Sequence, residues 1–242
     1  MRRKKMKKRL NFMLIFGLAG ILIFSTTVMG YAADAVQFDQ NSQMKDEAYW
    51  NEIKELKVKA ESYVDSVVSP ARVGGHKSLT IPTKKQINYY YCGPASLRMV
   101  LLYHGIDQTQ SYIAGKIGTT EAGSDVAPMR TYLNSQVGSG TYTYVNVSEL
   151  AFSDGLVYSI DKRKPLICMI QTSKLEYYKG HKSVHFVVAK GYDWDMNGSA
   201  SYSTVTLNDP NNNNDYYGER TCKWTEMSQA LNASNGWYIM AK

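Results

Sequence analysis

A cysteine at the start of an apolar helix constrains this chain more than any other feature of its sequence. Residues 91–96 read Tyr-Cys-Gly-Pro-Ala-Ser, and the next seven residues are apolar apart from one arginine. Pro94 suits the first turn of a helix, where its missing N–H costs nothing, and Gly105 is typical of a helix end. A helix that is apolar on nearly every side is expected to be buried. The sequence therefore predicts a buried helix that begins near Cys92 and ends before Gly105.

Two interpretations of Cys92 remain open on this stretch alone. A thiol at a helix N-terminus lies near unsatisfied N–H groups and a partial positive charge, which lower its pKa and favour the reactive thiolate. A free cysteine is, on the other hand, commonly a small inert core residue. A cysteine nucleophile also requires a base, and the base requires a group that orients it. The remainder of the sequence has to supply both.

Residues 1–35 have the three-part pattern of a secretory signal peptide. Seven basic residues lie among the first nine, residues 12–24 carry no charge, and small residues surround Ala32 and Ala35. The uncharged run is shorter than the ~20 residues that span a bilayer. We expect cleavage after Ala32 or Ala35, and hence a secreted or cell-surface protein of a bacterium. The alternative is an uncleaved leader, which would then provide the contact with the membrane.

The basic charge of the chain belongs to this leader. The sequence has 28 basic and 21 acidic residues, and the seven basic residues before Asp34 leave 21 of each sign in the remainder. A neutral remainder gives no electrostatic reason to expect a nucleic-acid partner. The three cysteines show no metal-ligand spacing, so we expect no metal and no cofactor, although a bridge between Cys168 and Cys222 remains open.

The apolar spacing divides the chain beyond the leader into a helical extension with a linker (36–78) and one domain (79–242). Apolar residues three and four positions apart predict an amphipathic helix over 49–67, which Pro70 ends. We expect this helix to pack on the outside of the domain, with a propeptide role as the alternative.

Helices before strands in the domain predict an α+β fold with an antiparallel sheet. Besides the central helix, the patterns predict helices over 109–117, 126–137, 148–162 and 224–233, a polar hairpin-like insert at 119–124, and strands over 141–147, 165–171, 184–192, 201–208 and 237–241.

His185, in the predicted strand 184–192, is the best candidate for the base. Residues 197–198 are Asn-Gly, a strong hairpin signal, and folding the chain there pairs positions whose numbers sum to about 395. His185 then lies opposite Asp209 or its neighbour, so the two side chains should meet. A carboxylate there could hold the imidazole in one tautomer and support the imidazolium. His181, four residues earlier, is the alternative base.

Gln86, six residues before Cys92, is a candidate for the oxyanion hole. Its amide could donate to a developing oxyanion, with the backbone N–H of Cys92 as the second donor. The alternative is an exposed loop glutamine. Two groups of tyrosines, at residues 89–91 and 177–178, are expected to border the same site, although core and strand packing is the commoner use of tyrosine.

Three blocks of the sequence together resemble the C39-like branch of the papain-fold cysteine peptidases. They are Gln86 with the Cys-Gly-Pro-Ala-Ser segment and its helix, Val-His-Phe-Val-Val at residues 184–188, and Asn-Asp-Pro at residues 208–210. The resemblance covers roughly residues 79–242. The best-known members precede membrane transporters and cut leader peptides after paired glycines. This sequence has neither transporter helices nor a phosphate-binding loop, so that particular function is not carried over.

The resemblance implies a papain-like α+β fold and a peptidase that acts on a peptide or protein substrate. It implies Cys92 as the nucleophile, His185 as the general base and Asp209 as the residue that orients His185, with Gln86 in the oxyanion hole. Two other functions remain open on the same fold. One is a thiol-dependent acyl transferase or transpeptidase, and the other is a peptide-binding module without turnover.

Overall fold

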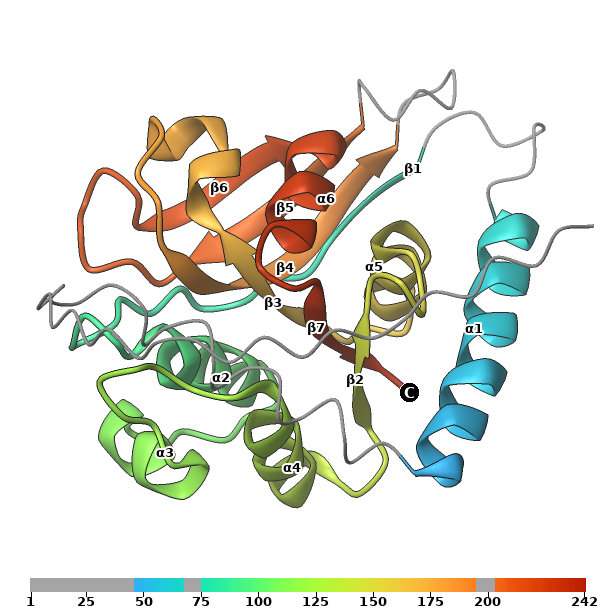
Figure 1. The fold of residues 1–242 in the computed structure, drawn as a ribbon, viewed down its shortest axis with the longest axis horizontal. Helices are drawn as coiled ribbons and strands as arrows, with labels where there is room; N and C mark the ends of the chain where they lie inside the picture. Colours follow the sequence, from blue (N-terminus) through green and yellow to red (C-terminus); the bar gives the residue numbers. More distant parts are fainter. Residues whose placement is uncertain (1–45, 68–74, 195–202) are drawn as a thin grey trace, which may run out of the picture.

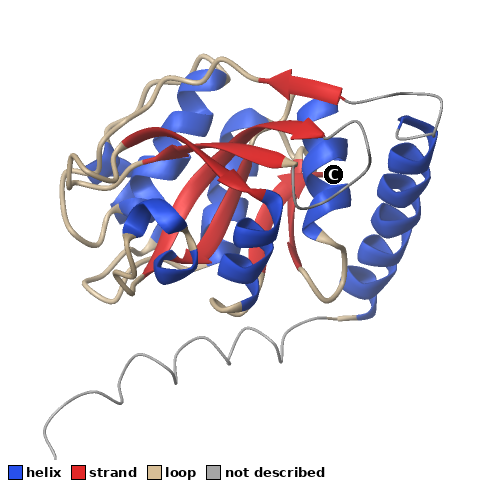
Figure 2. Cartoon of the chain, turned by 90° about the horizontal axis from the view of Figure 1, so that it is seen from above, coloured by secondary structure: helices blue, strands red, loops and turns tan. Residues whose placement is uncertain are grey.

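One antiparallel sheet organises the protein, with helices packed around it (Figures 1 and 2). The computed structural model describes residues 46–67, 75–194 and 203–242, so the predicted leader lies outside the described residues. Within these ranges the strand order is β2-β7-β3-β4-β5-β6, and β1 pairs with β4. The α+β prediction is therefore confirmed.

The helices follow the apolar patterns of the sequence closely. Their bounds are α1 Glu47–Val67, α2 Cys92–Tyr103, α3 Gln110–Ile117, α4 Val126–Val137, α5 Phe152–Asp161 and α6 Trp224–Asn232, with short 3-10 turns η2 Thr172–Lys174 and η3 Glu176–Tyr178. Only α5 differs appreciably from its prediction, because residues 148–151 form a turn before it. The predicted insert at 119–124 contains an isolated antiparallel bridge between Thr120 and Gly123.

The strands agree with the prediction except at two edges. Their bounds are β1 Gly75–Ser78, β2 Tyr142–Asn146, β3 Leu166–Gln171, β4 Val184–Trp194, β5 Thr204–Asp209, β6 Gly218–Lys223 and β7 Trp237–Ala241. The sequence prediction missed β6 and assigned the residues of β1 to a linker. Both are edge segments, mostly polar and largely exposed, so they lack the apolar alternation by which a strand is recognised.

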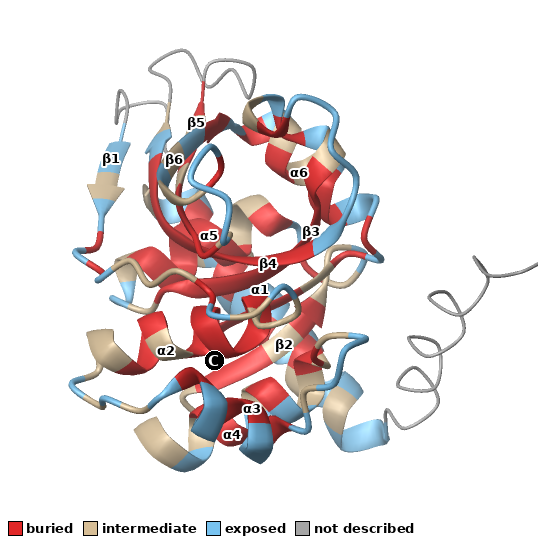
Figure 3. Cartoon of the chain, turned by 90° about the vertical axis from the view of Figure 1, so that its left-hand side faces the viewer, coloured by how far each residue is buried: buried red, intermediate tan, exposed pale blue. Residues whose placement is uncertain are grey.

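Strand β4 is the centre of the sheet. Along one edge it pairs first with β3 and then with β1, and along the other edge it pairs with β5. Gly191 allows β1 to approach, because a Cβ at this position would lie 2.7 Å from the backbone oxygen of Lys77. In Figures 1 and 3, helices α2, α3 and α4 lie on one side of β4 and α6 lies on the other.

Helix α1 packs on α5 and lies apart from α2 (Figure 1). Its buried residues are Ile53, Leu56, Ala60 and Val64, spaced as the amphipathic pattern predicted. The hydroxyl of Tyr63 donates to Asp161 at the end of α5, with an oxygen–oxygen distance of 2.9 Å. These contacts agree with an outer packing helix. None of the helices in the described ranges is both long and apolar enough to cross a membrane.

Two helical glycines provide a matched test of the packing of α5. A Cβ on Gly155 would lie 2.8 Å from the ring of Tyr238, whereas a Cβ on Gly115 in α3 would meet no atom within 4 Å. Gly155→Ala should lower the free energy of unfolding by roughly 1–3 kcal/mol, because it overpacks the core. Gly115→Ala should raise it by about 0.5–1 kcal/mol through helix propensity. Chemical denaturation measures both, and equal changes would contradict the packing described here.

Candidate active site

Cys92 is the first residue of α2, and its side chain is buried. The hydroxyl of Ser96, one turn later on the helix, donates to the backbone oxygen of Phe186 in β4 over 3.3 Å. This hydrogen bond and the packing of α2 on β4 fix the start of the helix beside the strand that carries His185. Gly93 is needed for close packing, because a Cβ there would lie 2.7 Å from the Cβ of Ser124.

Cys92, His185 and Asp209 form a continuous chain of contacts. The imidazole of His185 hydrogen bonds to the thiol of Cys92. Its Nε2 lies 2.9 Å from Oδ1 of Asp209, which leaves Nδ1 for the thiol. All three side chains are buried, and Asp209 is wholly inaccessible to solvent. The structure thus brings together three of the four residues that the sequence singled out.

The strand register that produces this contact differs slightly from the predicted one. The observed pairs of β4 and β5 include Val188 with Asn208, so the residue numbers sum to 396. One residue further on, Asp209 falls opposite Val187 rather than opposite His185. Nearer the turn, pairs such as Gly191 with Thr206 sum to 397, and a bulge at Lys190 changes the sum to 396, which the turn sequence does not reveal. His185 and Asp209 still meet because they are diagonal neighbours on one face of the sheet.

The contacts set the protonation states of the site. Burial by itself would raise the pKa of Cys92, but the hydrogen bond and charge of His185 outweigh it and hold this pKa below its ordinary value. Burial would lower the pKa of His185, but the charge and hydrogen bond of Asp209 raise it to about 10. Burial would raise the pKa of Asp209, but the charge of His185 and the hydrogen bonds from its donors outweigh burial and lower this pKa, so the carboxylate stays ionised. The favoured state is a thiolate beside an imidazolium.

Gln86 is buried in the loop before α2, so the alternative of an exposed glutamine is excluded. Its Nε2 donates to the backbone oxygens of Asn88 and Tyr89 at 2.9 and 3.0 Å. Its Oε1 is buried without a hydrogen-bond partner. The backbone N–H of Gln86 donates to the oxygen of Pro210, just after Asp209, which ties this loop to the end of β5.

The other three histidines lie in different surroundings. His181, the alternative base, is exposed, and its ring lies 5.6 Å from that of Tyr216. His104, at the far end of α2, contacts the hydroxyl of Tyr142. His76 of β1 has its Nδ1 3.8 Å from a carboxylate oxygen of Asp193 on β4. Among the described residues, His185 is the histidine that contacts Cys92 and a carboxylate together.

The other two cysteines are not part of this site. Cys168 and Cys222 are free and buried, so the bridge left open by the sequence is absent. Burial raises the pKa of Cys168 far above its ordinary value and that of Cys222 to about 12. In the described part of the chain, no three His, Cys, Asp or Glu side chains gather as a metal site would require.

Two tyrosines that were expected to border the site contact Asp209 directly, a role that the sequence did not indicate. The hydroxyls of Tyr177 and Tyr178 donate to Oδ2 of Asp209, both at 2.7 Å. The only sequence signal was their position on a loop before the histidine strand.

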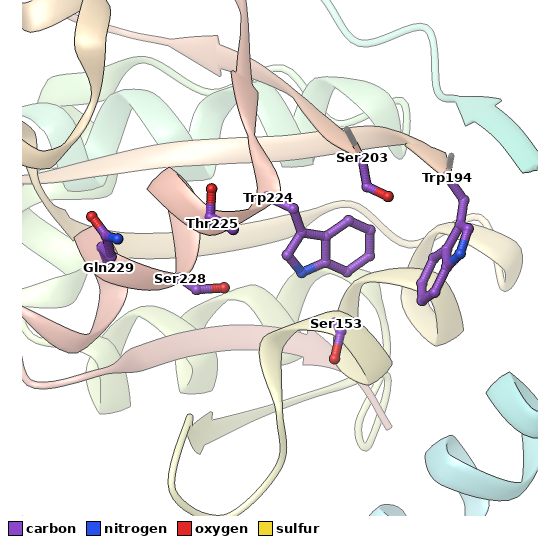
Figure 4. Close-up of a pocket in the computed structure, with 7 residues that line it drawn as sticks. All are labelled: Ser153, Trp194, Ser203, Trp224, Thr225, Ser228 and Gln229. Atoms are coloured by element: carbon purple, nitrogen blue, oxygen red, sulfur yellow. The ribbon is translucent and has the colours of Figure 1, made fainter. Parts of the chain in front are cut away.

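A separate cavity of about 460 Å³ lies at the opposite ends of β4 and β5 (Figure 4). Trp194 and Trp224 form its aromatic wall, with ring centroids 5.0 Å apart. Hydroxyl and amide side chains complete the lining: Ser153, Ser203, Thr225, Ser228 and Gln229. Cys92, His185 and Asp209 do not line this cavity.

The comparison with protein families identifies the group to which this arrangement belongs. Residues 78–239 match the Peptidase_C39 like family, which is more than half of the chain. The chain belongs to the C39-like cysteine peptidase family. The fold is α+β, with the cysteine on a helix packed against an antiparallel sheet that carries the histidine, as the sequence resemblance implied. No curated protein matches the chain.

Several solved structures are similar to this C39-like chain at low sequence identity. A double glycine motif protease from an AMS/PCAT transporter, solved with its leader peptide, is 19% identical with a TM-score of 0.43, over 68% of this chain and 92% of that one. The peptidase domain of Streptococcus ComA, a bi-functional ABC transporter, is 17% identical with a TM-score of 0.44, over 65% and 95%. Bromelain from Ananas comosus, in complex with the E64 inhibitor, is 12% identical with a TM-score of 0.44, over 71% and 99%.

The reactivity of Cys92 tests the geometry of the site. Iodoacetamide should label Cys92 well below pH 8.5, because the imidazolium of His185 stabilises the thiolate. His185→Ala should move labelling of Cys92 to higher pH, since a buried thiol without a cationic partner has a raised pKa. His181→Ala, four residues away and exposed, should leave the profile unchanged.

Mass spectrometry at each pH identifies the labelled cysteine. Cys168 and Cys222 should remain unlabelled near neutral pH because burial raises their pKa values. A Cys92 profile that is the same in the wild type and in His185→Ala would contradict the contact between the two side chains.

Proposed function

We propose that this member of the C39-like family is an exported peptidase that hydrolyses peptide bonds through Cys92, His185 and Asp209. The observation that carries the proposal is the chain of contacts from the thiol to the imidazole and on to the buried carboxylate. Family membership supplies the reaction class, and the substrate is accordingly a peptide or protein. The binding-module alternative is less well supported, because it gives no reason for a buried thiol with a lowered pKa.

The first half of the reaction forms a thioester. The thiolate of Cys92 attacks the carbonyl carbon of the peptide, and the carbonyl oxygen becomes an oxyanion. The imidazolium of His185 gives its proton to the leaving nitrogen as the C–N bond breaks, so that a free amine departs. Asp209 keeps the imidazole in the tautomer that directs Nδ1 to the sulfur.

The second half of the reaction releases the acid product. Neutral His185 takes a proton from a water molecule, which attacks the thioester carbonyl. The C–S bond then breaks, and the thiolate of Cys92 and the imidazolium of His185 are restored together. An amine in place of water would give a transpeptidase by the same steps. Mass spectrometry of the products with an added amine such as glycinamide distinguishes the two: an amide product indicates acyl transfer, and a free acid indicates hydrolysis.

We propose export on the basis of the leader pattern in residues 1–35. The protein would then work outside the cytoplasm, released by cleavage after Ala32 or Ala35; in the alternative, an uncleaved leader would attach it to the membrane. N-terminal sequencing of protein recovered from the medium of an expressing bacterium tests this. A chain that stays in the cytoplasm with its first residues intact would contradict it.

Replacement of the nucleophile tests the peptidase activity. Cys92→Ala should abolish cleavage of a randomised peptide library, because the two remaining thiols, Cys168 and Cys222, are buried with raised pKa values and should not form the thioester in its place. The matched control is Cys222→Ala, which removes a buried thiol outside the site and should retain cleavage. Product peptides are identified by mass spectrometry. Equal cleavage by wild type and Cys92→Ala would contradict a thiol mechanism.

Gln86 should contribute to the oxyanion hole. In the substrate-free structure its amide donates to two loop carbonyls, so one of these hydrogen bonds has to be exchanged for the oxyanion. Gln86→Ala should lower kcat by roughly 10²-fold, the usual effect of losing one such donor. Iodoacetamide labelling of Cys92 forms no oxyanion and should change little. A parallel loss of both reactions would indicate that Gln86 only supports the loop.

A further inference from the structure

Asp209 accepts four hydrogen bonds, and only one of them comes from His185. Oδ1 accepts from Nε2 of His185 and from the backbone N–H of Asn211, both at 2.9 Å. Oδ2 accepts from the hydroxyls of Tyr177 and Tyr178, both at 2.7 Å. Each oxygen of the carboxylate therefore has its own pair of donors. The carboxylate cannot rotate to exchange its oxygens without breaking bonds on both sides.

The loop that carries the two tyrosines is held at both ends. It connects β3 to β4, and the hydroxyl of Thr172 closes it by donating to the oxygen of His181 and accepting from the N–H of Ser183, at 2.6 and 2.8 Å. Leu175 anchors its middle in the core. Such a closed loop presents both phenols to Asp209 with little freedom to move.

An aromatic cluster covers the His185–Asp209 pair. The ring of Tyr178 lies 4.7 Å from that of Tyr177, 4.5 Å from that of Tyr216 and 6.2 Å from that of His185. Tyr178 is 2% exposed, so solvent does not reach its hydroxyl side. Water is excluded from the carboxylate, and the phenols take the place of its hydration shell.

The charged and titratable groups around Asp209 come from several elements. His185 lies on β4, Tyr177 and Tyr178 lie on η3, and Cys92 of α2 reaches Asp209 through His185. On β6, Cys222 is close to Tyr177, and the guanidinium of Arg220 lies 5.6 Å from the Tyr177 ring centroid. Arg220 does not bind the carboxylate, because it donates to the backbone oxygens of residues 215–217.

We propose that Tyr177 and Tyr178 are positioning residues, which keep Asp209 ionised and hold its Oδ1 on His185 during the reaction. Their hydroxyls donate to Asp209, so they act through the carboxylate. The proposal rests on the proposed function, since it gives these tyrosines a part in supporting the thiolate–imidazolium pair.

Removal of the two phenol hydroxyls should change the pKa of Asp209, and with it the pH dependence of Cys92 reactivity, in a known direction. Hydrogen bonds from Tyr177 and Tyr178 stabilise the charged form of Asp209, so their loss raises the pKa of this buried carboxyl. The carboxyl then takes up a proton at a higher pH. A neutral Asp209 no longer supports the imidazolium, and the thiolate of Cys92 is lost with it. The acid limb of Cys92 reactivity consequently moves to higher pH.

The experiment measures the rate of iodoacetamide labelling of Cys92 against pH in the purified protein. The variants are Tyr177→Phe, Tyr178→Phe and the double variant. The matched control is Tyr63→Phe with Tyr192→Phe, because these two phenols also donate to one carboxylate, Asp161, at 2.9 Å each. The control removes the same chemical groups at a different carboxylate.

The double variant should move the midpoint of the acid limb upward by about one pH unit or more, since a hydrogen bond to a charged group is worth roughly one such unit. Labelling on that limb should be about tenfold slower at a given pH. Each single variant should move the midpoint in the same direction by less, and either one suffices if the double variant does not fold. The control should leave the midpoint where it is in the wild type.

Asp209→Asn separates an effect through the carboxylate from a general structural effect. In that background, Tyr178→Phe should move the acid limb no further, because there is no carboxylate left to stabilise. Movement of equal size with and without Asp209 would overturn the proposal, as would a shift in the control variant.

The labelling profiles also separate a failure of the tyrosine role from a failure of the proposed function. A reactive Cys92 whose profile depends on His185 but not on the tyrosines overturns only the role of the tyrosines. A wild-type Cys92 that behaves as an ordinary thiol at every pH overturns the proposed function and this inference with it.

Discussion

The buried charge of Asp209 is the constraint on which the rest of the site depends. An ionised carboxylate without solvent is costly unless hydrogen bonds replace its water. The structure supplies these bonds from three directions: His185 on β4, the tyrosine loop after β3, and the backbone after β5. The loops around this end of the sheet therefore have to converge on one carboxylate. Their convergence in turn sets the orientation of the imidazole.

The contact between α2 and β4 transmits this arrangement to the thiol. Ser96 links the helix to the backbone beside His185, and Gly93 lets the first turn pack closely. Cys92 thereby meets the imidazole at the helix N-terminus, where a partial positive charge also favours the thiolate. Helix α1, by contrast, packs on α5 and makes the outer layer of the fold. The packing of α2 on the sheet at β4 thus places the thiol of Cys92.

Much of the fold follows from short-range patterns, and the exceptions have a common cause. The helices and central strands carry the apolar periodicity of elements that bury one or more faces. Strands β1 and β6 do not, because edge strands gain their pairing from a neighbour and leave most side chains in solvent. His185 contacts Asp209, as the predicted hairpin suggested, although the observed register of the two strands differs from the predicted one. The two residues are diagonal neighbours rather than directly opposite each other, and this placement still allows the hydrogen bond between them.

From the amino-acid sequence it was already clear that a cysteine begins a buried helix, and that a histidine and an aspartate lie on two neighbouring strands. These features depend on residues close together in the chain, where propensity and spacing act directly. The donors that surround Asp209 and the orientation of Gln86 in its loop became known from the folded structure alone. Tyr177 and Tyr178 are separated from Asp209 by a strand and a hairpin, so no local pattern connects them. The need to satisfy a buried charge brings them together, and that need arises only once the chain has folded.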